Sequence, residues 1–114
     1  DMVATRYGAK MQAATEIALT KLDVISYMKE IPVCTEYELD GDRISDFPFP
    51  MLLNDCRPVI KTLPGWGEDI SRIRRFEDLP KAARDYVLYI ENGIGKPVSY
   101  VSVGPERDEI IVRL

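Results

Sequence analysis

The sequence predicts a mixed α/β fold, with short helices around a mixed sheet and a β-hairpin near residues 31–47. Three observations support this class. Two stretches, 3–14 and 79–93, repeat apolar residues at helical spacing. Several apolar runs have the length of single strands, and the two kinds of pattern are interspersed along the chain. The chain has 114 residues, of which 46% are hydrophobic and 30% charged, which is typical of one globular domain.

The first elements follow from residue spacing. Apolar residues recur every three or four positions over 3–14, so this stretch is expected to form an amphipathic helix. The apolar run 16–20 predicts a short buried strand, and residues 21–27 predict a turn or a single helical turn. The chain begins with Asp1 and enters the first helix at once. A processed or trimmed terminus is one explanation; with the motifs described below, we expect instead the rear part of a longer protein.

The middle of the chain is predicted to form strands. Residues 31–39 alternate apolar and acidic side chains, which indicates a half-buried strand. Asp-Gly at 40–41 predicts a tight hairpin turn, and residues 43–47 are expected to form the returning strand. Residues 58–63 predict a further short strand, which Pro64-Gly65 closes.

The rest of the chain predicts one helix and two strands. Residues 67–79 are rich in charge and are expected to be a connector. The helix over 79–93 has proline near its start and Gly93 as its expected stop. Residues 98–104 and 109–114 predict two strands joined by the turn Gly-Pro-Glu-Arg-Asp.

Composition excludes several classes of function. The net charge of −4 and the pI of about 4.8 argue against a nucleic-acid backbone reader. No apolar run approaches the roughly 20 residues that span a bilayer. There is no histidine, and Cys34 and Cys56 lack the spacing of metal ligands. We expect reduced thiols, a cytoplasmic location and no metal site in this chain.

One ionic pair follows the first predicted strand directly. Lys21 and Asp23 stand where ligands bind in open α/β sheets, at the carboxyl end of a strand. A carboxylate can accept two parallel hydrogen bonds from the ring N1–H and the exocyclic amino group of guanine. Adenine offers an acceptor at N1 instead, so the same carboxylate would reject it. The alternative is a solvated strand end in which Asp23 caps the next turn.

A second segment has complementary chemistry. Ser102, Val103 and Gly104 end another apolar strand, and Pro105 fixes the turn that follows. Glycine allows the backbone to approach a ligand closely, and backbone N–H groups here could donate to the guanine O6. The alternative is an ordinary Gly-Pro turn.

Together these residues resemble the C-terminal part of adenylosuccinate synthetase. The motif Leu-Thr-Lys-Leu-Asp-Val at 19–24 precedes Ser-Val-Gly-Pro at 102–105, and Thr-Leu-Pro-Gly-Trp at 62–66 lies between them. The closing stretch from Leu79 onward is similar as well, so the resemblance covers essentially the whole chain. Gln-Ala-Ala-Thr-Glu at 12–16 departs from the family, which usually has an Asn-Gly-like pair there.

The resemblance implies a function. The family joins IMP and L-aspartate to adenylosuccinate, releasing GDP and phosphate from GTP, in AMP biosynthesis. It implies that Lys21, Leu22, Asp23, Ser102, Val103 and Gly104 hold the guanine base, with Pro105 as a wall. It also implies Mg²⁺ on the phosphates, a homodimer, and catalytic residues outside this chain. The phosphate loop and the arginine-rich substrate loop are expected upstream of Asp1, so 1–114 is expected to be a single C-terminal region that is inactive alone.

Two rival functions remain open on the residues themselves. The chain could be a stand-alone interaction module that offers strand 31–39 as an edge to a partner. It could also be another guanine-nucleotide protein such as a GTPase, although Thr20 replaces the usual Asn before Lys-x-Asp.

Three other features are interpreted as structural. Trp66 is expected to be a buried anchor for its turn. The arginines at 72, 74 and 75 are expected to pair with neighbouring acids. The acidic pair around Gly41 is expected to be a hairpin turn rather than a calcium loop.

Overall fold

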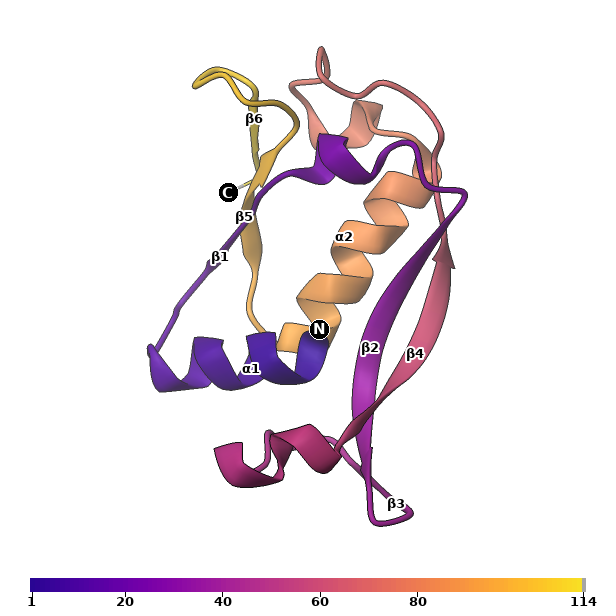
Figure 1. The fold of residues 1–114 in the computed structure, drawn as a ribbon. Helices are drawn as coiled ribbons and strands as arrows, with labels where there is room; N and C mark the ends of the chain where they lie inside the picture. Colours follow the sequence, from indigo (N-terminus) through magenta and orange to yellow (C-terminus); the bar gives the residue numbers. More distant parts are fainter. Residues whose placement is uncertain (114) are drawn as a thin grey trace.

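Helix α2 lies between two small sheets in a computed structural model that describes residues 1–113 (Figure 1). One sheet is mixed and has the order β1-β5-β6; the other is antiparallel with the order β3-β2-β4. The elements run in the order α1 (Met2–Met11), β1 (Ile17–Leu19), η1 (Leu22–Ile25), β2 (Glu30–Leu39), β3 (Asp42–Ile44), η2 (Pro50–Asp55), β4 (Arg57–Pro64), η3 (Phe76–Asp78), α2 (Lys81–Ile94), β5 (Val98–Ser102) and β6 (Ile110–Val112). The mixed α/β class is confirmed, with two sheets rather than one.

The mixed sheet joins distant parts of the sequence. β1 pairs with β5 in parallel, with Leu19 opposite Val101, and β5 pairs with β6 in antiparallel fashion. The last expected strand is shorter than 109–114, and its Leu114 lies outside the described residues. Because β1 and β5 run in the same direction, their carboxyl ends lie at one edge of this sheet.

The antiparallel sheet is a long twisted ribbon of β2 and β4, to which β3 adds a short hairpin strand at one end (Figure 1). β2 pairs with β4 over Glu30–Glu38, with a register shift between Cys34 and Glu36 that turns Cys34 inward alongside Tyr37. The predicted turn between β2 and β3 is confirmed. Asp40 and Gly41 have φ values of 52° and 84°, which is the pair of positive angles that a type I′ turn requires.

The returning strand was predicted too long, because β3 ends at Ile44 rather than at residue 47. Beyond it the chain turns toward α1. The Ser45 carbonyl accepts a hydrogen bond from Arg6, and the Phe47 ring stacks on Tyr7 at 4.8 Å between centroids. These contacts with α1 replace the strand pairing that the local pattern predicted.

Helix α2 extends beyond its predicted stop. Gly93 lies inside the helix, and the C-cap is Gly95, with φ of 77°. A left-handed C-cap is the conformation for which glycine is favoured. Gly93 has another reason: an added Cβ there would collide with the Met2 side chain, which packs against the helix. Helix α1 is also shorter than predicted and ends at Met11, because Ala13 takes a positive φ of 51°.

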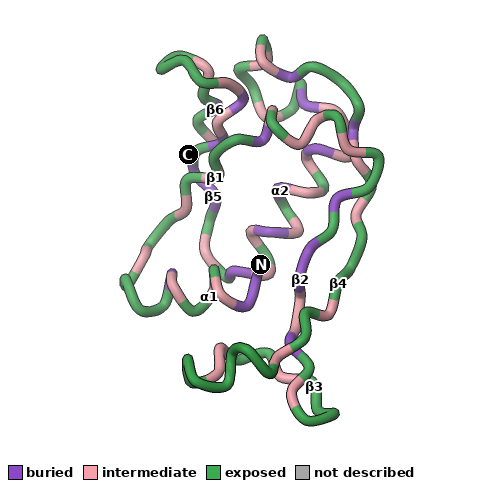
Figure 2. Tube along the Cα trace, in the orientation of Figure 1, coloured by how far each residue is buried: buried purple, intermediate pink, exposed green. Residues whose placement is uncertain are grey.

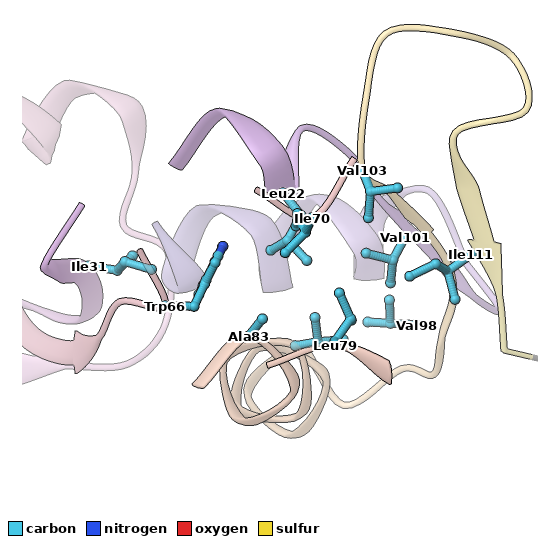
Figure 3. Packing of buried hydrophobic residues seen from close by; sticks show 11 residues of the cluster. Leu22, Ile31, Trp66, Ile70, Leu79, Ala83, Val98, Val101, Val103 and Ile111 are labelled. Atoms are coloured by element: carbon cyan, nitrogen blue, oxygen red, sulfur yellow. The ribbon is translucent and has the colours of Figure 1, made fainter. Parts of the chain in front are cut away.

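The core runs through both sides of α2, and Figure 2 shows buried positions along its turns. Ala83 and Val87 pack with Val98 and Val101 of the mixed sheet, whereas Ile90 joins a second cluster on the other side. Figure 3 shows the first cluster, which takes its buried side chains from η1, β2, the 66–70 segment, α2, β5, β6 and the residues just before α2 and after β5: Leu22, Ile31, Trp66, Ile70, Leu79, Ala83, Val87, Val98, Val101, Val103 and Ile111.

Candidate functional site

The two segments predicted to hold a guanine base meet at one edge of the mixed sheet. Residues 20–23 leave the carboxyl end of β1, and residues 102–104 leave the carboxyl end of the parallel neighbour β5. η1, which carries Asp23, also contacts β5 directly. Asp23 and Ser102 are 79 residues apart in sequence, so this convergence is a product of the fold. The carboxyl edge of parallel strands is where α/β proteins bind ligands.

Lys21 forms the turn between β1 and η1. It is exposed and takes the left-handed conformation, with φ of 63° and ψ of 33°, at the start of η1. Its carbonyl accepts the Val24 amide at 3.2 Å. A left-handed lysine is an uncommon and costly conformation, of the kind that collects at ligand sites.

After this turn the Leu22 side chain points into the core, whereas the Asp23 side chain is half-buried. The Leu22 side chain is 1% exposed and lies in the core cluster beside Ile70 (Figure 3). It therefore anchors the segment and presents only its backbone to the edge. The Asp23 side chain is half-buried, and no group among residues 1–113 donates a hydrogen bond to its carboxylate. Its two oxygens remain free for an external pair of donors.

The Ser102–Gly104 segment is also anchored by its central residue. Val103 is fully buried in the same core cluster, and its amide donates to the Glu109 carbonyl at 2.9 Å. This bond removes Val103 from the backbone donors that the sequence suggested. The Gly104 amide, by contrast, has no acceptor within the described part of the chain. The Ser102 hydroxyl donates to the Gly104 carbonyl at 3.2 Å.

The Pro-Gly-Trp segment supports η1 from the other side. Trp66 is buried, as predicted, and its Nε1 donates to the Ser26 hydroxyl at 2.8 Å. The Gly65 amide donates to the Lys29 carbonyl at 2.8 Å, and an added Cβ there would clash with the Met28 backbone. The turn therefore holds the residues that follow the Lys21–Asp23 segment.

Burial and hydrogen bonding shift the pKa values of several side chains. Burial raises the pKa of Tyr37 and of Tyr86, and the Ser71 amide lowers the pKa of Asp69 by hydrogen bonding to its carboxylate. No cluster of three potential metal ligands is present in residues 1–113.

The predictions for the arginines and for strand 31–39 are met in part. Arg75 pairs with Glu77 as expected, at 3.9 Å, but Arg74 reaches across to Asp108, also at 3.9 Å. β2 pairs with β4 along Glu30–Glu38, but β3 covers its other edge only at Tyr37–Leu39, so Glu30–Glu36 has no strand partner on that side among the described residues. The described helices include none that is both long and apolar enough to cross a membrane.

Comparison with known proteins decides the family. The family model of adenylosuccinate synthetase matches residues 1–111. The chain belongs to the adenylosuccinate synthetase family. An adenylosuccinate synthetase of Mycobacterium marinum is 50% identical over 114 residues, and one of Streptomyces coelicolor is 45% identical over 112 residues. These alignments cover 99% and 97% of this chain.

The three-dimensional likeness is equally extensive. A structure of fully ligated adenylosuccinate synthetase from Plasmodium falciparum superposes with a TM-score of 0.94 at 32% identity, covering all of this chain and 28% of that one. The chain spans about a quarter of the length of the relatives it matches, 26% in both bacterial examples. The resemblance predicted from the Lys-Leu-Asp and Ser-Val-Gly-Pro motifs is thereby confirmed.

Two features of the site were not predicted from sequence. Ile70 lies in the stretch interpreted as a charged connector, yet it is fully buried beneath Leu22 and the other core residues. Its position between charged residues at 69 and 72 concealed it. Glu109 was interpreted as the start of a strand, but its side chain folds back onto Gly104. No signal in the sequence distinguishes it from the acidic residues beside it.

Proposed function

We propose that this chain supplies the guanine-base site of a GTP-dependent ligase that joins IMP and L-aspartate to adenylosuccinate, in the route to AMP. In this reaction the oxygen on carbon 6 of IMP accepts the γ-phosphoryl group of GTP, and GDP is released. The aspartate amine then displaces phosphate at the same carbon. Family membership supports the reaction class, and one observation supports the local role: the two base-binding segments converge at one sheet edge.

The free carboxylate of Asp23 is the proposed source of specificity for guanine. Its two oxygens can accept from N1–H and from the 2-amino group in parallel, as a carboxylate accepts other paired donors. Adenine would place an acceptor against the carboxylate and leave it half-buried and unpaired. Asp23 would therefore both attract guanine and exclude adenine.

Lys21 and the Ser102–Gly104 segment complete the proposed pocket. The exposed Lys21 can lay its aliphatic stem over the purine face while its ammonium group stays in water. The unbonded Gly104 amide can donate to O6, which adenine lacks. In this scheme Leu22 and Val103 hold the two backbones in place through their buried side chains, and Pro105 is a wall beside the base.

The remaining parts of the reaction are proposed to lie outside residues 1–114. These are the phosphate loop with its catalytic residues, the Mg²⁺ ligands and the arginine-rich loop that grips aspartate and IMP. We propose a cytoplasmic homodimer for the complete enzyme. The 114 residues alone are expected to form no adenylosuccinate from IMP, GTP and aspartate, and turnover by the purified 114-residue chain would contradict this division.

The test uses the full-length protein that contains this chain. The wild type should form adenylosuccinate with GTP and not with ATP. Asp23→Asn replaces one acceptor oxygen by a donor, so the KM for GTP should rise at least about tenfold, the equivalent of one charge-assisted hydrogen bond. Inosine triphosphate lacks the 2-amino group, so the preference for GTP over it should fall in the same variant.

A matched control separates guanine recognition from loss of charge. Asp40 is exposed in the β2–β3 turn, far from the sheet edge, and asparagine is well suited to its positive φ of 52°. Asp40→Asn should leave both KM values at the wild-type level. An unchanged KM for GTP in Asp23→Asn would contradict the proposed base contact.

A further inference from the structure

Glu109 holds together both ends of the loop that carries the Gly104 amide. Its backbone carbonyl accepts the Val103 amide at 2.9 Å, which continues the β5–β6 ladder one step beyond Ser102 and Ile110. Its own amide donates to the Glu106 carbonyl at 3.0 Å. Its carboxylate Oε2 accepts the Glu106 amide at 2.8 Å. Glu109 thus takes part in three hydrogen bonds, as acceptor in two and donor in one, and together they close the loop over residues 103–109.

The same carboxylate lies against Gly104. A Cβ added at Gly104 would lie 2.5 Å from the Glu109 Cδ and 3.0 Å from Oε1, and closer still to Oε2. Gly104 is not among the positive-φ residues, so its backbone angles do not require glycine. The Glu109 carboxylate instead occupies the space that a Cβ would fill, so a side chain at 104 would displace it. The glycine and the glutamate are thus fitted to each other.

This packing fixes the peptide that would face the base. Val103 is held by its buried side chain and by the Glu109 carbonyl, and Gly104 is held by the carboxylate on its side-chain side. The Gly104 amide between them keeps one orientation and has no acceptor in the described structure. A donor that is pre-oriented in this way binds its acceptor without a further loss of backbone entropy.

We propose that Glu109 is a positioning residue for guanine recognition, which holds the Gly104 amide toward O6 of the base. The proposal rests on the proposed function above and adds to it. Glu109 itself makes no contact with the base in this scheme. Its effect is confined to O6, which GTP and inosine triphosphate share, whereas Asp23 accepts from N1–H, which both share, and from the 2-amino group, which only GTP has.

The test compares Glu109→Ala with Glu109→Gln in the full-length protein. Alanine removes the acceptor of the Glu106 amide and the packing on Gly104. It should raise the KM for GTP and for inosine triphosphate by the same factor of about tenfold. Glutamine keeps the length and one acceptor oxygen, so it should stay within about threefold of the wild type. The kcat and the KM values for IMP and aspartate should not change in either variant.

Glu106→Ala is the matched control. It removes the same charge from the same loop, but the Glu106 side chain is exposed, and Glu106 bonds to Glu109 only through its backbone amide and carbonyl. Its kinetic constants should equal those of the wild type. Equal effects of Glu106→Ala and Glu109→Ala would show a charge effect and overturn the proposal.

The other outcomes are equally decisive. An unchanged KM for GTP in Glu109→Ala overturns the proposal, and so does a parallel loss in kcat and in the KM values for IMP and aspartate, which indicates general loosening. If Glu109→Ala raises the KM for GTP but not the KM for inosine triphosphate, Glu109 contacts the 2-amino group directly, and the positioning role is overturned. Wild-type protein that forms no adenylosuccinate overturns the proposed function together with this inference.

Discussion

Gly65→Ala should destabilise the chain strongly, because the new methyl group would meet backbone rather than a movable side chain. The added Cβ would lie 2.8 Å from the Met28 carbonyl carbon and 3.1 Å from the Lys29 carbonyl carbon, with the Met28 oxygen closer still. To relieve this clash the 64–66 turn must move away from residues 28–29. That movement breaks the 2.8 Å bond from the Gly65 amide to the Lys29 carbonyl.

The size of the effect follows from these two losses. Overpacking at a rigid contact costs about 1–3 kcal/mol. Loss of the backbone hydrogen bond adds about 1 kcal/mol. We therefore expect the free energy of unfolding to fall by about 3 kcal/mol. With a urea m-value of about 2 kcal/mol per molar, the midpoint should fall by roughly 1.5 M.

Urea unfolding followed by tryptophan fluorescence measures this change directly. Trp66 is the single tryptophan of the chain, and it is buried next to the substituted turn. Two glycines serve as controls, since nothing lies within 4 Å of a Cβ added at either. Gly67→Ala should cost about 1 kcal/mol, because its φ of 60° is left-handed. Gly8→Ala, inside α1, should stabilise the chain by about 0.5–1 kcal/mol. A loss at Gly65 no larger than that at Gly67 would refute the reasoning.

Three further predictions concern the packing around the site. Val101→Ala empties part of a fully buried core position and should lower the free energy of unfolding by about 2 kcal/mol in the same urea titration. Trp66→Phe removes the donor to Ser26 and should cost about 1 kcal/mol, measured by circular dichroism because the fluorophore is lost. Burial raises the pKa of Glu91, but hydrogen bonds and charge from Arg113, with the Val98 amide, outweigh it and hold that pKa below its usual value. The resulting stability is present above the unfolded pKa of about 4.3 and is lost as the pH falls through the lower folded pKa. Glu91→Gln should remove this part of the acid dependence, and an unaltered pH profile would contradict the assignment.

Local signals in the sequence predicted those elements whose geometry is set by neighbouring residues. The Asp40-Gly41 turn is an example, because its two positive φ values are a property of the dipeptide. The strand 31–39 and the helix from residue 81 onward were also found, since each has a clear apolar period. The two segments predicted to hold a guanine base were placed at strand ends from the same apolar patterns.

Tertiary contacts account for the differences. The returning strand stops at Ile44 because Phe47 has a partner in α1, which no local pattern reveals. Gly93 looked like a helix stop, but it leaves space for Met2, which is 91 positions away. Glu109 was interpreted as the first residue of a strand, and its contact with Gly104 depends on where the loop places its carboxylate. Each of these features requires knowledge of what packs nearby, and residue type alone does not supply it.

The parallel pairing of β1 with β5 has a consequence for synthesis of the protein. A ribosome that has released the chain as far as Pro97 has produced the Lys21–Asp23 turn without the strand beside it. Guanine nucleotide cannot then assist early folding, because its proposed pocket is assembled from segments made at very different times. Pairing across such a separation in sequence is slow, since a long loop must close first. During that interval the edge of β1 that later pairs with β5 is exposed to other chains, and an unpaired strand edge is prone to aggregate.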